Sequence, residues 1–220
     1  MNDALIRLRE LSFSYEPERP VLRRVDFALG PGERVALVGA NGSGKTTLLH
    51  LMVGLLRPNG GTIEAFGAAR RREADFHEVR ARAGLLFQDA DDQLFCPTVR
   101  EDVAFGPLNL GRSRDEVRAD VAETLDSLGL AGYEDRITYR LSGGEKRLVA
   151  LASVLAMKPE VLLLDQPDGD LDEETRERIT EILAGLPLAM IVVAHDRDFL
   201  ARVTDRAVRL GDGVLEPCEL

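Results

Sequence analysis

The sequence has few of the residues that mark a secreted, metal-binding or membrane-spanning protein. Its two cysteines, Cys96 and Cys218, show no metal-ligand spacing, so neither a disulfide framework nor a thiolate metal site is expected, and a reducing cytosol is the natural compartment. Of its three histidines, His50 and His77 match no motif and are expected to be structural or on the surface. The N-terminus lacks the apolar core of a signal peptide. The longest apolar run, residues 148–157, is about half of what a membrane span needs.

Positive charge is also in deficit. The chain has 28 Lys and Arg against 38 Asp and Glu, which gives a formal net charge of −10. A protein that wraps nucleic acid needs a basic face, so this balance argues against that function. Residues 70–72 are three consecutive arginines and offer one local basic patch, although a solvated turn is the commoner role of such a run. The 220 residues, 45% of them hydrophobic, suffice for one substantial domain.

What the chain does have is a glycine-rich segment between an apolar strand and an apolar helix. Residues 39–46 read Gly-Ala-Asn-Gly-Ser-Gly-Lys-Thr and match the phosphate-binding P-loop pattern. Glycines let the backbone turn tightly and direct several N–H groups at one anion. Lys45 can reach the β- and γ-phosphates of a nucleotide, and the Thr46 hydroxyl can ligate Mg²⁺. The strand is expected at residues 34–38 and the helix at residues 47–53.

The rest of the pattern predicts an α/β core that is interrupted by helices. Residues 4–29 alternate as β segments, and further strands are expected at residues 62–66, 84–87, 161–164 and 189–193. Helices are expected at residues 144–157, 173–184 and 197–204, followed by a last hairpin around residues 211–213. Residues 89–140 instead show helix signals, including a capping box at residues 113–116, and so predict an inserted helical lobe.

Two further segments carry polar groups at the ends of these elements. Asp165 ends the apolar strand 161–164, where a carboxylate can hold Mg²⁺ through water. Residues 141–145, Leu-Ser-Gly-Gly-Glu, precede a helix and offer a second anion site at its N-terminus. Either segment alone is weak evidence, because buried strands often end in Asp and a Ser-Gly-Gly turn can simply cap a helix.

In combination these motifs resemble the ATPase subunits of ABC transporters over essentially the whole chain. The family's order is kept: Tyr15, the P-loop, Gln88, the signature segment 141–145, Asp165 and His195. The resemblance implies a single α/β domain over residues 1–220 with a P-loop NTPase core, an N-terminal antiparallel β subdomain and an inserted α-helical subdomain. The core would comprise residues 1–88 and 141–220, and the helical subdomain about residues 89–140.

The resemblance also implies ATP and Mg²⁺ as ligands and gives each motif residue a role. Tyr15 would stack on adenine, and the other nucleotide contacts would be Gly39, Ala40, Asn41, Gly42, Ser43, Gly44, Lys45, Thr46, Thr47 and Gln88. The Mg²⁺ ligands would be Thr46, Gln88 and Asp165, and the catalytic residues would be Lys45, Asp165, Gln166 and His195. The signature residues would close over the ATP of the opposite subunit, so that sites form only between two protomers; they are Leu141, Ser142, Gly143, Gly144 and Glu145.

A narrower resemblance covers residues 89–107, which look like those of energy-coupling factor importers, a group that includes cobalt, nickel and vitamin importers. Five apolar side chains are expected to line a groove for a short helix of a membrane subunit, namely Leu94, Phe95, Val99, Val103 and Phe105. The alternative is that they form only the core of the helical lobe. We favour the groove, because the stretch directly follows Gln88.

One position departs from the family pattern. The family reads Asp-Glu-Pro-Thr where this chain reads Asp165-Gln166-Pro167-Asp168, and the next residues, Gly169 and Asp170, depart as well. Glutamine can position a water but cannot accept its proton, and such general-base help is typically worth about 10²–10⁴-fold. Tight ATP binding with slow turnover is therefore expected. A glutamine introduced to trap ATP and a naturally weakened site both fit this sequence, with a slight preference for the first.

The leading interpretation is an ATP-hydrolysing motor subunit of a bacterial importer, peripheral on the cytoplasmic face of the inner membrane. Its expected partners are a second ATPase subunit, preferably an identical copy, and a transmembrane coupling subunit through which alone it would contact the membrane. On resemblance, cobalt is the preferred cargo, followed by nickel and by biotin or another vitamin. Two other classes are open: an ATP-gated dimerising module with little catalysis, and a soluble ABC protein of DNA repair or translation.

Overall fold

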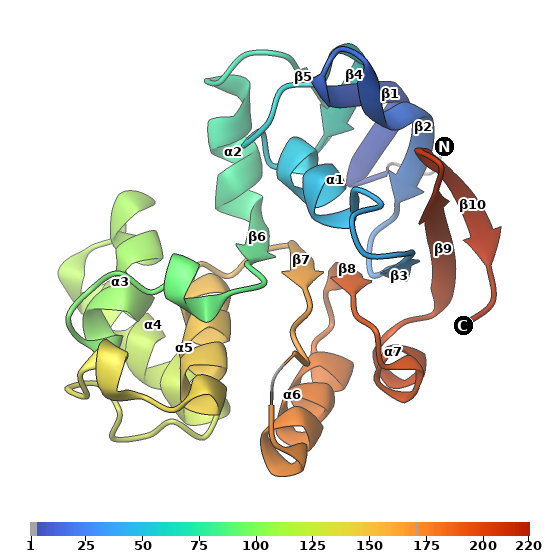
Figure 1. Cartoon of the computed structure of the whole chain (residues 1–220). Helices are drawn as coiled ribbons and strands as arrows, with labels where there is room; N and C mark the ends of the chain where they lie inside the picture. Colours follow the sequence, from blue (N-terminus) through green and yellow to red (C-terminus); the bar gives the residue numbers. More distant parts are fainter. Residues whose placement is uncertain (1–3, 170) are drawn as a thin grey trace.

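The computed structural model describes residues 4–169 and 171–220, so Asp170 lies outside the described residues. Its larger sheet contains β3 (Arg34–Val38), β6 (Ala83–Leu86), β7 (Val161–Asp165), β8 (Ala189–Val193), β9 (Arg206–Gly211) and β10 (Val214–Cys218). The strand order is β10-β9-β3-β8-β7-β6, with β10 antiparallel to β9 and the other neighbours parallel (Figure 1). Every residue of β7 and β8 is buried, as expected for parallel strands covered on both faces. The carboxyl ends of the parallel strands meet at one edge, where ligands bind in such sheets.

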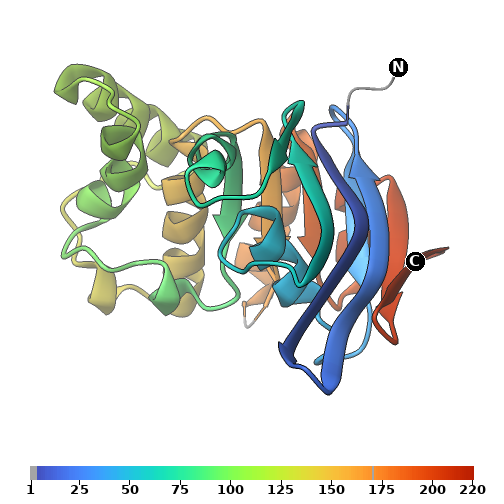
Figure 2. The same cartoon turned by 90° about the horizontal axis from the view of Figure 1, so that it is seen from above.

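A smaller antiparallel sheet lies on one side of the molecule, seen as the long blue strands of Figure 2. It contains β1 (Ile6–Glu16), β2 (Arg19–Leu29), β4 (Gly60–Ala65) and β5 (Ala68–Arg70), in the order β2-β1-β4-β5. Ile6, Leu8 and Leu11 of β1 are buried and share one hydrophobic cluster with Leu48 and Leu49 of α1 (Lys45–Met52). The sheet therefore packs on the helix that follows the glycine-rich loop.

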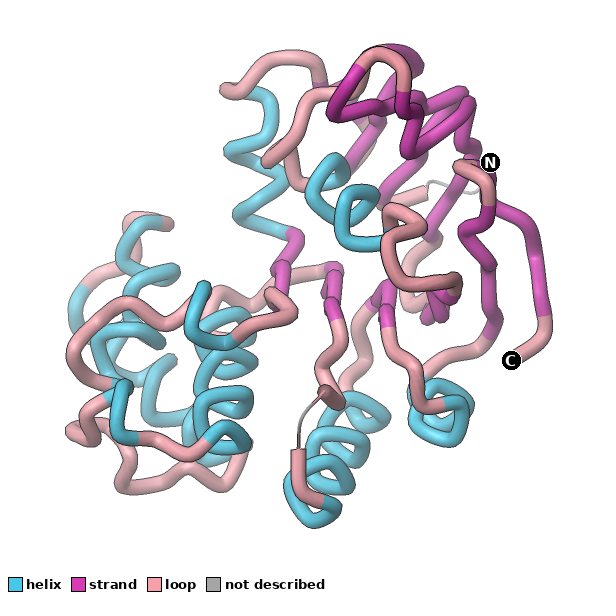
Figure 3. The backbone as a smooth tube through the Cα atoms, viewed as in Figure 1, coloured by secondary structure: helices cyan, strands magenta, loops and turns pink. Residues whose placement is uncertain are grey.

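A helical lobe lies on the other side of the larger sheet (Figure 3). It contains α3 (Val99–Asn109) and α4 (Arg114–Ser127), which pack with α5 (Gly143–Leu155) in a second hydrophobic cluster. All three helices begin with a capping box, in which the hydroxyl of the cap residue accepts a backbone N–H and a glutamate three residues later accepts the N–H of the cap residue. The pairs are Thr98–Glu101, Ser113–Glu116 and Ser142–Glu145. α3 and α4 fall within the range expected for the lobe, while the bounds of the subdomain stay a prediction.

Three more helices complete the architecture: α2 (Asp75–Arg82), α6 (Glu173–Gly185) and α7 (Arg197–Val203). The sequence predicted α6 and α7 but not α2, in which only Phe76 and Val79 are buried, too few for a periodic apolar pattern. The α/β architecture with an antiparallel subdomain and a helical insertion is confirmed. Within the described parts of the chain, no helix is both long and apolar enough to cross a membrane.

Candidate functional site

The glycine-rich loop connects the carboxyl end of β3 to the first turn of α1. Gly39 has φ 153° and Gly44 has φ 103°, and a Cβ on them would lie 2.4 Å from the Leu210 carbonyl oxygen and 2.6 Å from Val21 Cγ1, respectively. Only glycine fits at these two positions. The first N–H groups of a helix have no partner within the helix, so the start of α1 offers donors and a positive dipole end to an anion.

Lys45 is buried but forms no ion pair among the described residues. Its side chain is 6% exposed, and its Nζ donates to the carbonyl oxygens of Gly39 and Ala40, each at 2.9 Å. Burial lowers the pKa of Lys45, and the nearby Asp165 carboxylate partly offsets this shift. A cation held only by two neutral carbonyls is well placed to exchange them for the oxygens of a phosphate.

Asp165 and Ser43 leave polar atoms buried without a partner. The Thr46 hydroxyl donates to Oδ2 of Asp165, a residue that is 2% exposed at the end of β7. Among the described residues, Oδ1 of Asp165 and Oγ of Ser43 are buried and accept or donate no hydrogen bond. Such groups cost free energy unless something binds them, so each unpaired atom indicates a ligand. A carboxylate beside a hydroxyl is a donor set that suits Mg²⁺, and the loop suits a triphosphate, so the residues present fit Mg²⁺-ATP.

Gln166 directly follows β7 and has an unusual backbone. Its φ is 49°, a left-handed conformation that a non-glycine residue rarely adopts, and its N–H donates to the Val193 carbonyl at 2.8 Å. The half-buried side chain lines a cavity of about 470 Å³ together with Thr46, Gln88 and Asp165. The structure thus brings the expected Mg²⁺ ligands and Gln166 together in one cavity.

The same cavity contains a histidine to which the sequence assigned no site role. His50 lies one helical turn after Thr46 on α1, and its ring meets the edge of the Phe87 ring at a centroid distance of 5.9 Å. Burial lowers the pKa of His50, which favours the neutral imidazole. The spacing of four residues from Thr46 is the only sequence signal for this placement.

Gln88 is exposed, and two side chains hold its loop against α5. Arg147 donates to the Phe87 carbonyl at 2.7 Å and also to the Gln88 carbonyl. Gln93 accepts the Phe87 N–H at 3.0 Å and donates to the Ala150 carbonyl at 3.0 Å. The sequence analysis gave neither Arg147 nor Gln93 a role, because no local pattern links positions about sixty residues apart.

A second, larger cavity of about 950 Å³ adjoins the glycine-rich loop. His195, exposed just after β8, lines it together with Gly39 to Ser43. His195 and Gln166 therefore line different cavities. Three arginines without an ion-pair partner among the described residues line the larger cavity, namely Arg23, Arg197 and Arg209. They were not predicted, and they place positive charge beside the loop in a cavity whose lining also includes Asp212 and Glu219.

Tyr15 is 64% exposed near the tip of the β1–β2 hairpin. Its hydroxyl lies 3.0 Å from the Thr47 hydroxyl on α1, and its ring packs edge-on to Phe13 with centroids 4.8 Å apart. An exposed ring tethered over the start of α1 is able to stack on a base. Its expected adenine contact remains a prediction.

The signature residues form the capped N-terminus of α5. Ser142 and Glu145 bond reciprocally, and Tyr133 and Arg136 donate to Glu145 at 2.8 and 2.9 Å. The N–H of Ser142 makes the largest contribution to holding the pKa of Glu145 below its usual value. Leu141 is buried at 8% exposure and anchors the turn. Figure 1 shows this end of α5 in the helical lobe, apart from the loop that precedes α1, although Gly143 reaches the rim of the 470 Å³ cavity.

The expected apolar groove is wrong for three of its five residues. Leu94, Val99 and Val103 belong to the hydrophobic core of the helical lobe, with exposures of 8%, 0% and 0%. Phe95 and Phe105 are exposed, and their rings pack edge-on with centroids 4.8 Å apart. These two rings line a mainly apolar groove of about 340 Å³ that also includes Val53, Leu55, Phe87 and Met157. α3 turns Val99 and Val103 inward, and the loop before it buries Leu94, which spacing alone did not reveal.

Comparisons with known proteins agree with this geometry. Residues 22–169 match the family model described as ABC transporter. A Brucella suis relative is 54% identical over 216 residues, covering 98% of this chain and 90% of its own; it is described as an ABC transporter ATP-binding protein, with no cargo in its name. The energy-coupling factor transporter ATP-binding protein EcfA of Methanothermobacter thermautotrophicus is 44% identical, and the match covers 96% of this chain and 69% of EcfA. The cobalt import ATP-binding protein CbiO of Syntrophus aciditrophicus is 42% identical, and the match covers 95% of this chain and 76% of CbiO.

Solved structures of ABC transporter ATP-binding chains are also similar to this chain. CbiO1 of Clostridium perfringens, described as part of the ABC transporter complex CbiONQ, has a TM-score of 0.86 and 32% identity, covering 97% of this chain and 87% of its own. A dimeric ATP-binding cassette in a post-hydrolysis state with ADP and Pi has a TM-score of 0.87 and 27% identity. That match covers 98% of this chain and 99% of the cassette. With its phosphate loop, its unpaired Asp165 oxygen and its capped signature turn, the chain belongs to the ABC transporter ATP-binding family.

Proposed function

We propose that this chain is the ATP-hydrolysing motor subunit of an energy-coupling factor importer, with cobalt as its leading cargo. The names of EcfA and CbiO among its relatives, and of the CbiONQ complex, support the importer type and the cobalt assignment. Nickel is the next candidate, and a vitamin such as biotin is the alternative cargo. Cargo is selected by other subunits, so nothing in this chain's own cavities distinguishes them.

The observation that carries the proposal is the unsatisfied phosphate-loop half of the site. Among the described residues, the buried Lys45 bonds only to neutral carbonyl oxygens, and a buried hydroxyl at Ser43 and a buried oxygen on Asp165 have no hydrogen-bond partner. Mg²⁺-ATP supplies the missing partners, since its phosphates accept from lysine and hydroxyl while the metal takes the carboxylate. The other half of the site, at Ser142, comes from a second copy of the chain.

The chemistry follows from what these residues can donate and accept. Bound Mg²⁺ supplies charge neutralisation for the β- and γ-phosphates, and Thr46 and Asp165 hold it. Lys45 leaves its two carbonyls and donates to phosphate oxygens, which stabilises negative charge as a water attacks the γ-phosphorus and ADP departs. Gln166 orients that water through its amide but takes no proton, so the proton passes to an oxygen of the phosphate product instead of to a carboxylate base, and turnover is slow. His195 donates to the γ-phosphate from the rim of the larger cavity.

The coupling to transport runs through the Gln88 loop. Phe95 and Phe105 accept a short helix of a transmembrane coupling subunit in the exposed groove. Arg147 and Gln93 tie the loop between Gln88 and this groove to α5, whose N-terminus is the signature turn. Pairing of two chains over ATP therefore moves the groove, on the cytoplasmic face of the membrane, and hydrolysis releases the pair.

A trans-complementation experiment tests the composite site. Lys45→Ala and Ser142→Ala each damage a different half, so neither variant alone is expected to dimerise with ATP in light scattering. A mixture of the two restores one intact site, made from Lys45 of one chain and Ser142 of the other, and is expected to recover pairing. Pairing of either variant alone at wild-type ATP concentrations, or a mixture that stays monomeric while each variant is folded, would refute the composite site.

One observation favours a second function, an ATP-gated dimerising module with little catalysis. The position that follows Asp165 is Gln166, and the side chain that it contributes to the cavity is an amide, which accepts no proton. ATP-dependent pairing with no phosphate release, even from a Gln166→Glu variant with membrane subunits present, would select this module over the motor.

A further inference from the structure

A small basic cavity lies away from both nucleotide cavities, where the turn from β5 into α2 faces the segment after α1. It measures about 320 Å³, and its lining includes Arg57, Arg70, Arg71 and Arg72 together with Gly54 and Glu73. The four arginines are conspicuous in a chain of net charge −10. The sequence analysis noted residues 70–72 but favoured a solvated turn.

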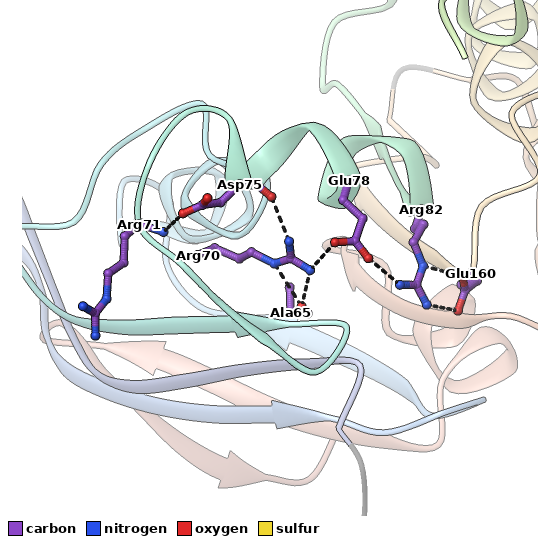
Figure 4. A network of polar contacts seen from close by, with 7 residues as sticks. All are labelled: Ala65, Arg70, Arg71, Asp75, Glu78, Arg82 and Glu160. Carbon is purple, nitrogen blue, oxygen red and sulfur yellow. Dashed lines mark hydrogen bonds and ion pairs between the residues drawn. The ribbon is translucent and has the colours of Figure 1, made fainter. Parts of the chain in front are cut away.

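Arg70 is fully engaged and forms the floor of this cavity. Its guanidinium is buried and donates to the carbonyl oxygens of Ala65 and Asp75, and it pairs with Glu78 at 2.8 Å. Glu78 in turn pairs with Arg82, which pairs with Glu160 at 2.6 Å, as the dashed lines of Figure 4 show. This chain of contacts ties the turn to α2 and to the segment before β7, so the cavity has a rigid base.

Arg71 and Arg72 are held by their backbones and leave their side chains available. The Asp75 carboxylate accepts the N–H groups of both residues, each at 2.9 Å. Figure 4 shows the Arg71 side chain extending away from the network. Within the described residues, the guanidinium groups of Arg57, Arg71 and Arg72 have no hydrogen bond or ion pair, although Arg72 interacts electrostatically with the Asp75 carboxylate. The one lining carboxylate, Glu73, is already paired with Arg80.

Three exposed guanidinium groups around one cavity fit a phosphate. Guanidinium forks bond to phosphate oxygens in pairs, and several of them neutralise its charge without a buried counter-ion. The position of the cavity indicates where that phosphate belongs. Gly54 and Arg57 line the basic cavity while Val53 and Leu55 of the same turn line the apolar groove, and Leu55 is 49% exposed.

We propose that Arg57, Arg71 and Arg72 bind the phosphate of an anionic phospholipid headgroup. The inference rests on the proposed function, which turns the adjoining groove of Phe95 and Phe105 towards a membrane subunit. The basic cavity then faces the membrane surface beside that subunit, where anionic headgroups are presented. Each arginine near such a surface strengthens binding about fivefold, so the cluster supports a reversible contact and not an anchor.

Vesicle sedimentation of the full chain tests this proposal. The wild-type chain is expected to bind vesicles of phosphatidylcholine that contain phosphatidylglycerol and to ignore phosphatidylcholine alone. The variant Arg57→Gln, Arg71→Gln, Arg72→Gln is expected to lose about a hundredfold in affinity, or about fivefold per arginine. A control triple, Arg100→Gln, Arg114→Gln, Arg118→Gln, makes the same charge change on the helical lobe and is expected to retain binding.

Several outcomes would overturn the headgroup site. Equal losses in both triple variants would show non-specific attraction. Inorganic phosphate that binds the wild-type chain but not the Arg57, Arg71, Arg72 variant in calorimetry, while neither chain binds vesicles, would assign the site to a soluble anion. If the variant failed only to bind a membrane subunit in lipid-free detergent, an acidic protein segment would be the ligand. ATP-driven pairing is measured in parallel: a wild-type chain that pairs but binds no anionic vesicle refutes only the lipid site, whereas a chain that does not pair refutes the proposed function.

Discussion

The two half-sites proposed for this chain differ in whether their polar groups already have hydrogen-bond partners within the chain. In the phosphate-loop half, Ser43 Oγ and Asp165 Oδ1 are buried without partners among the described residues. In the signature half, Ser142 and Glu145 bond reciprocally, and two further side chains donate to Glu145. The first half therefore keeps buried polar atoms for a ligand to bind, while the second is a preformed helix end. Nucleotide affinity should depend on the first half and pairing on both.

The largest effect is expected from restoring a carboxylate to the phosphate-loop half. Gln166→Glu supplies a proton acceptor beside the attacking water, so ATP turnover should rise at least tenfold, since general-base catalysis typically contributes about 10²–10⁴-fold. Steady-state phosphate release measures the rate, and ATP affinity should stay similar because the shape is nearly unchanged. An unchanged rate would show that Gln166 does not limit hydrolysis.

Removing the loop cation should give the next largest effect. Lys45→Ala deletes the buried ammonium, and hydrogen bonds to charged groups contribute about 1.5–3 kcal/mol, so ATP affinity should fall about 10- to 100-fold in calorimetry. Arg118→Ala is the control, because it removes a positive charge that is 74% exposed on α4. Equal losses in the two variants would mean that net charge, and not the phosphate loop, determines affinity.

Removing the helix cap of the signature half should affect ATP-driven pairing, whereas removing an equivalent helix cap elsewhere should affect stability alone. Ser142→Ala removes the N-cap of α5 and should lower the free energy of unfolding by about 1 kcal/mol in urea titrations. Ser113→Ala removes the matching capping box of α4 and should cost about the same. Only Ser142→Ala should also abolish ATP-driven pairing. If both variants paired normally, Ser142 would be a helix cap and nothing more.

The smallest effect concerns the pH dependence of the same cap. The N–H of Ser142, followed by the Tyr133 hydroxyl, lowers the pKa of Glu145 in the folded chain below its usual value of 4.5. The folded state therefore binds this proton less readily than the unfolded state, so the stabilisation is complete above pH 4.5 and is lost as the pH falls through the lowered pKa. Urea unfolding of wild type and Glu145→Gln should converge below that pH. A constant difference would show that Glu145 stabilises α5 without its charge.

Local motifs were the part of the fold and site that could be predicted. The phosphate loop, the capping box at residues 113–116 and the strand before Asp165 each depend on contacts among a few neighbouring residues. α2 was missed because it buries only two side chains. The groove was predicted with the wrong lining, because Val99 and Val103 share a helix with Phe105 and only packing against α4 and α5 decides which face turns inward.

By itself the sequence determined the α/β order, the phosphate-binding segment, the signature turn and the position where a glutamine replaces a carboxylate, since each is a short pattern with its own physical cause. Only the tertiary structure decided that Arg147 holds the Gln88 loop, that His195 and Gln166 line separate cavities, and that Arg57 joins Arg71 and Arg72. These placements join residues far apart in the chain, and they follow from how the sheets and the helical lobe pack together.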